Sequence, residues 1–510
     1  MRFKAVAAAV VFAAGLAGAS QAEDANKQGA KGLLGNLAAG LTGTSQAADV
    51  NEQGAKDLLG NLTHFMPDDL AKSGVVTVKP ADGRYEVTYD LKKFLDKLNV
   101  SDFVITGLKP LTAFATPQDK GLWNIEGNNA IDVTARSKPG SKPDVEFRYA
   151  LASSSFQGVF DSALHYVRSA DVKGSGITLA TKTTDNGVQQ RNDITIDSVG
   201  YTLSSTDSGE PDKLDVQMQG GLQSFYDKIA NDTATLAEIK VGAIDFNAAA
   251  TKLPLKALNE LLRFASEHKD AKTLSDADST AIKALLQKMM PIAGSFSEAV
   301  AFKDIAVTTP LGDGGLQKVD YSVKLHGPSN AMNADFGLRA EKLTLASGLV
   351  PEDYIAFIPD TAEMQVQLPN LNFTALADVL QKTDFNHPAG QEAVDSQLQH
   401  AMFPDGKMTI NFPKISAVSG LYDVEASGSM RGALGDSNEV TLNMTILARD
   451  LDKTIAAVQE AAKTQQDLTQ FSFGLMMAKG FAKTDPDGRS RWEVSIADDK
   501  TVTINGQVIK

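Results

Sequence analysis

The 510-residue sequence contains no cysteine, and it has few positive charges for its length. The missing thiols exclude disulfide bonds, thiol catalysis, iron–sulfur clusters and thiolate zinc sites. Lys and Arg total 49 against 63 Asp and Glu, which gives a formal net charge of -14. Such a charge repels phosphate backbones and anionic membrane surfaces, so we expect no nucleic-acid partner.

Long apolar runs are also missing from the interior of the sequence. A membrane-spanning helix needs about 20 consecutive apolar residues, so we expect no transmembrane segment in the mature chain. The composition, 43% hydrophobic and 22% charged, is typical of a globular protein. At this length we expect two or more domains, or one elongated body.

The first 22 residues have the pattern of a cleavable signal peptide. Arg2 and Lys4 supply the positive amino-terminal part, and residues 5–16 form a short apolar core. Ser20 and Ala22 are the small residues that signal peptidase requires. We therefore expect export to the periplasm with cleavage after Ala22, which would change the formal net charge from -14 to -16 because Arg2 and Lys4 are lost.

A tandem duplication follows the expected leader. Residues 15–22 recur with small changes as 40–47, and residues 26–37 recur as 51–62. The second copy repeats the Ser-Gln-Ala triplet, which makes Ala47 an alternative cleavage site. With only two copies we interpret 23–70 as a duplicated segment rather than a functional repeat array. The second copy also places four apolar residues on one face of an expected helix: Ala55, Leu58, Leu59 and Leu62.

A strand that runs directly into an amphipathic helix is the most regular pattern of the sequence. In residues 439–462, four apolar residues alternate with polar ones and four more then recur at helical spacing: Val440, Leu442, Met444, Ile446, Leu451, Ile455, Val458 and Ala462. Similar units occur near residues 85, 239 and 364. We interpret the four units as a weak structural repeat.

Short alternating runs without intervening helices fill residues 102–220, which favours antiparallel pairing. Turn-rich stretches at 137–143 and 207–212 separate some of them. A second helix of the unit near 239 should begin at Ser275, a residue type that caps helices. We expect an α+β fold with mainly antiparallel, elongated or curved sheets and amphipathic helices packed on one face. Its β-rich halves should span 71–292, ending in this helical pair, and 293–510.

A search for chemistry finds no catalytic constellation, so we expect no enzyme, no cofactor and no metal site. The six histidines have no metal-ligand spacing: His64, His165, His268, His326, His387 and His400. Ser266 and Lys269 match a Ser-x-x-Lys pattern, but its partner motifs are missing, and we interpret the match as chance. The stretch 485–488 begins like a calcium loop yet has Ile496 where an EF-hand needs Glu, so we expect a tight turn.

Several stretches together resemble exported alphaproteobacterial proteins of unknown function: the leader, a Leu-Leu-Gly-Asn-Leu helix, residues 83–87, residues 121–123 and residues 502–506. More remotely the chain is similar to the long β-rich periplasmic YdgA and AsmA groups. The resemblance implies a periplasmic, elongated β-rich body. For the AsmA group it also implies an apolar groove linked to lipid or envelope homeostasis.

Three functions follow from these patterns. The first is a non-catalytic periplasmic protein with a binding or envelope-maintenance role. The second is a carrier of a lipid or other apolar ligand in a groove between sheet and helices. The third, an extracytoplasmic hydrolase, would need a carboxylate pair or a Ser-His pair that converges from distant segments. The expected partner is a lipid or an envelope protein.

Overall fold

The computed structural model describes residues 50–509 apart from gaps at 65, 67, 98–101, 142, 269–273, 291–292, 347, 383–390, 404–405 and 434–439. At 68, 266, 380 and 391–396 it describes the backbone alone. The expected leader, both cleavage sites (Ala22 and Ala47) and the first copy of the duplication lie outside the described residues.

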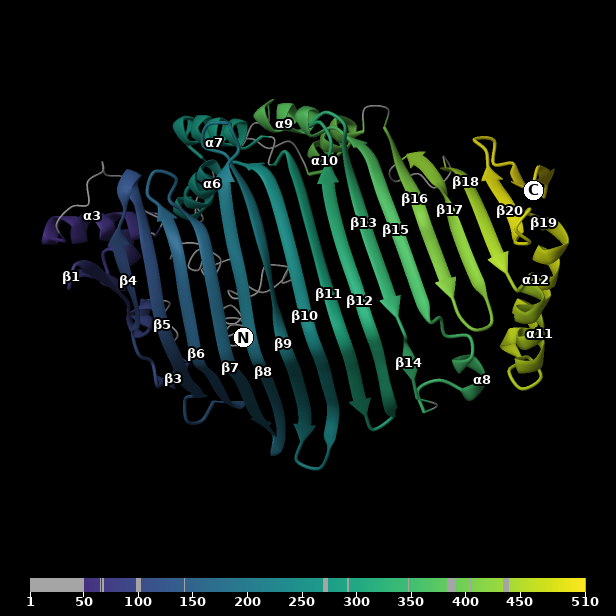
Figure 1. The fold of residues 1–510 in the computed structure, drawn as a ribbon, viewed down its shortest axis with the longest axis horizontal. Coiled ribbons are helices and arrows are strands. Elements are labelled where there is room, and N and C mark those ends of the chain that lie inside the picture. The colour runs from purple at the N-terminus through teal and green to yellow at the C-terminus, as the bar shows by residue number, and fades with distance from the viewer. Residues whose placement is uncertain are drawn as a thin grey trace. The chain divides into compact units, whose positions relative to one another are not determined.

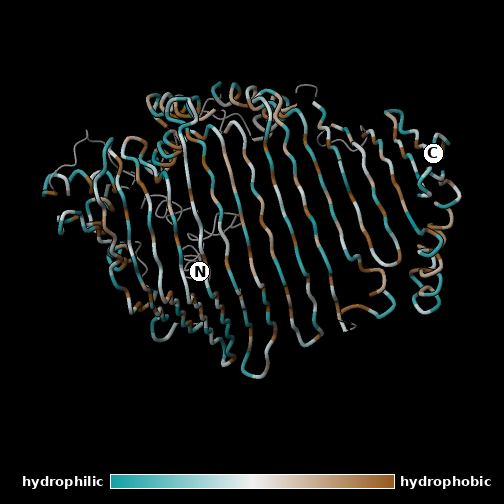
Figure 2. The backbone as a smooth tube through the Cα atoms, viewed as in Figure 1, coloured by the Kyte–Doolittle hydropathy of each residue, from teal (hydrophilic) through white to brown (hydrophobic). Residues whose placement is uncertain are grey.

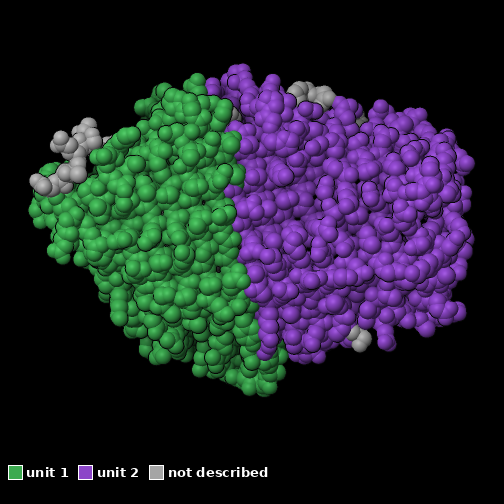
Figure 3. Space-filling view, in the orientation of Figure 1, with its two compact units in different colours: residues 1–236, 249–293 green, residues 237–248, 294–510 purple. Residues whose placement is uncertain are grey.

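The structure is mostly antiparallel sheet (56%) with 23% helix, which confirms the expected α+β class. The chain divides into two compact units, shown in green and purple in Figure 3. The first unit holds residues 1–236 and 249–293, and the second holds 237–248 and 294–510. Strand β10 (Thr235–Leu253) therefore contributes its ends to the first unit and its middle to the second.

The first unit is built on long antiparallel strands (Figure 1). Its strands are β1 (Val76–Ala81), β2 (Arg84–Tyr89), β3 (Phe103–Thr106), β4 (Leu111–Pro117), β5 (Leu122–Ser137), β6 (Asp144–Asp161), β7 (Tyr166–Asp185), β8 (Val188–Asp207) and β9 (Leu214–Asn231). They pair in the order β1, β2, β4, β5, β6, β7, β8, β9, and β3 pairs with the second half of β5. Its helices are α3 (Glu52–Leu62), α4 (Asp68–Ala71), α5 (Leu91–Lys97), α6 (Leu255–Glu267), α7 (Asp276–Met289) and the 3-10 turn η1 (Asp119–Gly121).

The expectation of short strands over 102–220 was wrong. Strands β7 and β8 each run for 20 residues without a break. Gly158 in β6 and Gly220 in β9 do not interrupt their strands. Both lie where the backbone of an adjacent strand approaches closely. A Cβ on Gly158 would lie 2.6 Å from the carbonyl oxygen of Ser169, so the glycine permits the contact rather than ending the strand.

The main core of the first unit lies where α3 packs with strands β1, β2, β4, β5 and β6. Helix α3 begins at Asn51, whose side chain accepts a hydrogen bond from the backbone N–H of Gly54 at 2.9 Å. Three of the four apolar residues expected on its inner face are buried, at 3%, 0% and 5% exposure, which confirms the expected helix: Ala55, Leu58 and Leu62.

The second unit has its strands in the same 22-stranded sheet as the first. Its further strands are β11 (Ser295–Thr309), β12 (Gly312–His326), β13 (Met332–Glu341), β14 (Thr344–Leu345), β15 (Thr361–Leu371), β16 (Lys407–Val418), β17 (Asp423–Ala433), β18 (Val440–Arg449), β19 (Lys483–Thr484), β20 (Ser490–Ile496), β21 (Val502–Ile504) and β22 (Gln507–Val508). They pair antiparallel in the order β11, β12, β13, β15, β16, β17, β18, β20, β21, β22, with β14 beside β12 and β19 beside β20. Its helices are α8 (Glu352–Ile355), α9 (Phe373–Lys382), α10 (Gln391–Met402), α11 (Leu451–Ala461) and α12 (Asp467–Phe481).

All four expected strand-to-helix units are present. They are β2 with α5, β10 with α6, β15 with α9, and β18 with α11. A single residue joins strand and helix in each unit: Asp90, Pro254, Asn372 and Asp450. Of these four, Asp450 is the one with a positive φ, at 54°. In the second unit, the pairs α9–α10 and α11–α12 each separate two strands that are neighbours in the sheet. The repeated element is therefore a strand, a helix pair and the adjacent antiparallel strand.

Residue types at helix ends and turns also agree with the structure. Ser275 caps α7 in a capping box with Asp278, as expected from its residue type. Asp82 and Gly83 both have positive φ and close the β1–β2 hairpin. The stretch 485–488 is a turn between β19 and β20, closed by a 2.9 Å hydrogen bond from the N–H of Gly488 to the carbonyl oxygen of Asp485.

Candidate functional site

The sheet of the second unit has one apolar face and one polar face, and brown and teal alternate along its strands in Figure 2. Residues that oppose each other across an antiparallel pair point to the same side of the sheet. The strand registers connect eight such residues on eight successive strands, which we call the central row: Val300, Tyr321, Leu338, Met364, Ile415, Ala426, Ile446 and Trp492.

A second row two residues along each strand is also mostly apolar. It holds Phe302, Val319, Ala340, Ala362, Ala417, Val424 and Ala448. We call the two rows together the apolar face. Since neighbouring strands are about 4.8 Å apart, a row over eight strands is about 34 Å long.

The middle of the apolar face is half-exposed. Tyr321 is 41% exposed, and Leu338 and Met364 are each 44% exposed. At its far end Trp492 is only 8% exposed. Exposed apolar residues are ordinary when single, but a contiguous row of them on adjacent strands marks a binding surface for a ligand, a partner or a membrane.

The opposite face of the same strands carries a chain of polar side chains. Nε2 of His326 lies 2.8 Å from Oδ2 of Asp335, and Gln367 donates to Oδ1 of Asp335 at 2.9 Å. Asn411 then donates to Gln367 at 3.0 Å. This hydrogen-bonded chain crosses four strands, from β12 to β16. The hydrogen-bonded chain fixes which face of the sheet is exposed to solvent. A slip of one residue in the strand register would bury these polar side chains and move the central row to the other face.

Helices α11 and α12 lie beside β20 at the yellow end of the chain (Figure 1). The indole Nε1 of Trp492 donates to the carbonyl oxygen of Ala478 in α12 at 2.7 Å. Ile455 of α11 is buried at 8%, whereas Val440 and Leu442 keep intermediate exposure. The helix pair thus has a buried face at this end, while the strands of the unit keep partly exposed apolar side chains.

The histidines take structural positions. His268 stacks on Phe264 at 4.2 Å between ring centroids and lies 3.3 Å from Asp278. His326 belongs to the polar chain above, His400 is exposed, and His387 lies outside the described residues. Within the part of the chain that the structure describes, no three His, Asp or Glu side chains gather in a way that could hold a metal ion.

A pair of stacked histidines forms a titratable cluster that the sequence gives no sign of. The rings of His64, after α3, and His165, between β6 and β7, stack at 4.4 Å and 16°. The pKa of His165 is lowered to about 4, and burial is the largest cause. The nearby His64 and Lys256 also lower this pKa, and Asp161 opposes the shift. Burial and Arg263 lower the pKa of His64, and Glu260 opposes the shift.

These lowered pKa values predict acid sensitivity. The ordinary histidine pKa is 6.5, so as the pH falls the unfolded chain takes up its protons first. The stability from the neutral stack is complete above about 6.5 and is lost between about 6.5 and 4. We expect the melting temperature of the wild type to fall over this window, and that of His165→Asn to fall less. Asn tolerates the positive φ of 52° at this position.

Thermal unfolding followed by circular dichroism as a function of pH measures this difference. The control is His400→Asn, which removes an exposed histidine outside the stack. Equal acid losses in wild type and His165→Asn would show that the stack does not set the dependence.

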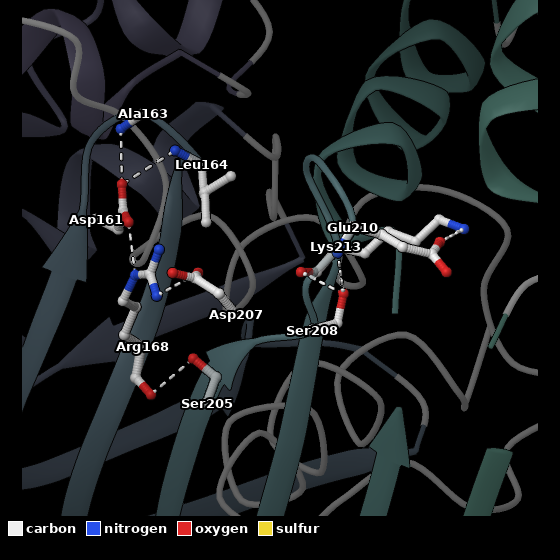
Figure 4. A network of polar contacts seen from close by, with 9 residues as sticks. All are labelled: Asp161, Ala163, Leu164, Arg168, Ser205, Asp207, Ser208, Glu210 and Lys213. Carbon is white, nitrogen blue, oxygen red and sulfur yellow. Dashed lines mark hydrogen bonds and ion pairs between the residues drawn. The ribbon is translucent and has the colours of Figure 1, made fainter. Parts of the chain in front are cut away.

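A buried ion pair lies close to the histidine stack in sequence. Asp161 accepts from the N–H groups of Ala163 and Leu164 at 2.9 and 3.2 Å and from Nε of Arg168 at 2.6 Å (Figure 4). Arg168 also reaches Asp207 at 2.9 Å. Each charged group in this network is paired, and Asp161 also bonds to the backbone of the turn that follows β6. We interpret the network as structural.

A pocket of about 140 Å³ lies in the first unit among residues of β5, β6 and β7. It is lined by Glu126, Gly127, Asn128, Ser155, Phe156, Gln157, Asp171 and Lys173. Glu126 is paired with Arg84 at 2.7 Å, and Lys173 with Asp171 at 3.0 Å. Its charges are paired with each other or with neighbours, so it offers no activated nucleophile or base.

The structure does not place the side chains of the Ser-x-x-Lys match. Lys269 and the side chain of Ser266 lie outside the described residues. No helix in the described ranges is long and apolar enough to cross a membrane.

Sequence reasoning found most strands of the apolar face but not the face itself. It missed β11, β13 and β17. In β13, Ala334, Phe336, Leu338 and Ala340 alternate with polar residues or glycine. In α12 the large apolar side chain is not the buried one. Phe471 is 56% exposed and the small Ser472 is buried at 5%.

Comparison with protein-family models, with curated proteins and with solved structures finds no match for the chain. The resemblance to the YdgA and AsmA groups therefore stays a prediction. The fold and the site define a β-rich protein with a partly exposed apolar sheet face, and the case for a function rests on that geometry.

Proposed function

We propose that the chain is a non-catalytic periplasmic protein that carries a lipid or another long apolar ligand on the apolar face of its second unit. The observation that carries the proposal is the central row, with Tyr321, Leu338 and Met364 between 41% and 44% exposed on three adjacent strands. An extended alkyl chain that lies along this row would cover side chains that otherwise face water. We also infer that α11 and α12 close one end of the binding face.

The shape of the row favours a long, narrow ligand. The row is about 34 Å long, and in the described part of the chain its middle is open, since Leu338 and Met364 are each 44% exposed. Affinity should therefore come from the length of the ligand rather than from enclosure. Each fully buried methylene contributes about 0.8 kcal/mol. A chain that lies on an open face buries roughly half of that surface, so affinity should rise about twofold for each added methylene.

Binding of fluorescent fatty-acid analogues of increasing chain length tests the proposal. We expect the wild type to bind the longer analogues more tightly. Leu338→Asp should weaken binding about tenfold or more, because a carboxylate beside the alkyl chain must be desolvated. Leu338 is half-exposed, so the variant should fold, and Leu338→Ser provides a second, uncharged test.

The matched control is Asn443→Asp, which adds the same charge to the polar face of β18. It should bind as the wild type does. Equal binding by Leu338→Asp and the wild type would place the ligand elsewhere. A wild type that binds none of the analogues would contradict the carrier function.

A further inference from the structure

Helix α12 has an unusual composition for a surface helix. Its 15 residues, Asp467–Phe481, include only two charged side chains, Asp467 and Lys479. Surface helices normally restrict apolar residues to one stripe that faces the core. In α12 the apolar residues continue around the helix.

The outward sides of α12 carry large apolar side chains. Phe471 is 56% exposed, Phe473 61%, Met476 44% and Met477 52%. The residue that α12 buries most deeply is Ser472, at 5%. Successive helix residues are about 100° apart, so Phe471 and Phe473 project on opposite flanks of the side that Ser472 turns inward.

Several contacts hold α12 firmly to the sheet of the second unit. Trp492 donates to the carbonyl oxygen of Ala478 at 2.7 Å, and Asn505 donates to that of Phe481 at 2.7 Å. Lys479 forms an ion pair with Asp452 of α11. The exposed apolar flanks are therefore a fixed surface. Val508 of β22 and the following Ile509 are also exposed, at 68% and 48%.

Charge separates this end of the chain from the rest. Residues 467–510 contain six acidic and six basic side chains and so carry no net charge, whereas the whole chain carries -14. A strongly acidic surface would be repelled by phosphate groups. The neutral end is electrostatically compatible with zwitterionic lipid headgroups.

We infer that α12 docks the second unit on the surface of a lipid bilayer with neutral headgroups. A groove on a partner protein receives one stripe of a helix. Exposed apolar side chains lie on both flanks of α12, Phe471 on one and Phe473 with Met477 on the other, and they call for an apolar phase that covers the whole outward side. Aromatic and other large apolar side chains are the ones that enter the headgroup and acyl-chain boundary. This docking goes beyond the proposed ligand binding and does not require it.

Flotation of the full mature chain with phosphatidylcholine vesicles tests the inference. We expect the wild type to float with the vesicles, and high salt should not release it, because screening acts on charges and not on apolar contacts. The double variant Phe473→Ser with Met477→Ser should float at least about tenfold less, since these two residues lie one turn apart on the outward side.

The matched control removes two exposed apolar side chains elsewhere in the second unit. Leu311 and Val418 are 73% and 38% exposed, and their double serine variant should float as the wild type does. Leu338→Asp should also float normally, which separates this test from that of ligand binding. Three results would each overturn docking. The first is no flotation of the wild type, and the second is flotation only with anionic vesicles. The third is a dimer that light scattering detects in the wild type but not in the Phe473→Ser, Met477→Ser variant, which would show that α12 is buried between two copies.

Discussion

Replacing Arg168 by alanine is expected to lower the free energy of unfolding by about 3 kcal/mol, because it leaves a buried carboxylate without its cation. The side chain of Asp161 is 8% exposed and that of Arg168 is 23% exposed, with 2.6 Å between Oδ2 and Nε. Two backbone N–H groups still reach Asp161 in the variant, from Ala163 and Leu164. Because these two hydrogen bonds remain, we expect the loss in the free energy of unfolding to lie near the lower end of the values known for broken buried pairs. Urea unfolding curves measure it.

The control for Arg168→Ala is Arg191→Ala in β8. Arg191 lies 2.6 Å from Asp193, but its side chain is 63% exposed. Water screens this pair, so its loss should cost about 1 kcal/mol or less. Equal losses in the two variants would contradict a special role for burial at Asp161.

Replacing Gly428 by alanine is expected to cost about 2–3 kcal/mol, because the added methyl group has no space. Gly428 lies in β17 opposite Met444 of β18. Its Cβ would lie 2.2 Å from the carbonyl oxygen of Asn443 and 2.7 Å from the Cα of Met444. Both obstacles are backbone atoms, so a side-chain rotation cannot relieve the clash and the strands must move apart.

Gly420→Ala is the matched control for Gly428→Ala. A Cβ on Gly420 would meet nothing within 4 Å, and its φ is not in the left-handed region. Its stability should stay within about 0.5 kcal/mol of the wild type. A neutral Gly428→Ala would show that β17 and β18 lie farther apart than their register indicates.

Patterns within a few residues allowed much of the fold to be predicted. The alternation from Val440 to Ile446 and the helical spacing from Leu451 give β18 and α11, because periodicity reflects which side of an element is buried. The cap at Ser275 was found from residue type alone. Such features depend on local backbone chemistry, which the sequence displays directly.

Features that depend on distant residues were not found. The long strands β7 and β8 pass through glycines whose role is set by the neighbouring strand. His64 and His165 stack although about 100 residues separate them, and neither lies in a recognisable motif. The central row exists only once eight strands are paired in register. Each of these features depends on which distant residues become neighbours in the folded chain. A single sequence does not show which residues those are.

The same alternation that builds the sheet of the second unit also produces its candidate site. Polar residues such as Asp335 and Gln367 bond across one face, and the residues between them therefore gather on the other. The helix pairs leave the row at Leu338 and Met364 half-exposed. An apolar surface of this extent in water is costly unless something covers it.

Native mass spectrometry of the protein purified from a periplasmic extract, combined with organic extraction, tests the central claim most directly. We expect the wild type to carry a lipid or other apolar molecule in defined stoichiometry and Leu338→Asp to carry less of it. A bare mass for the wild type, equal to the chain after cleavage at Ala22 or Ala47, would contradict the carrier function. It would leave the apolar face as a surface for a protein partner.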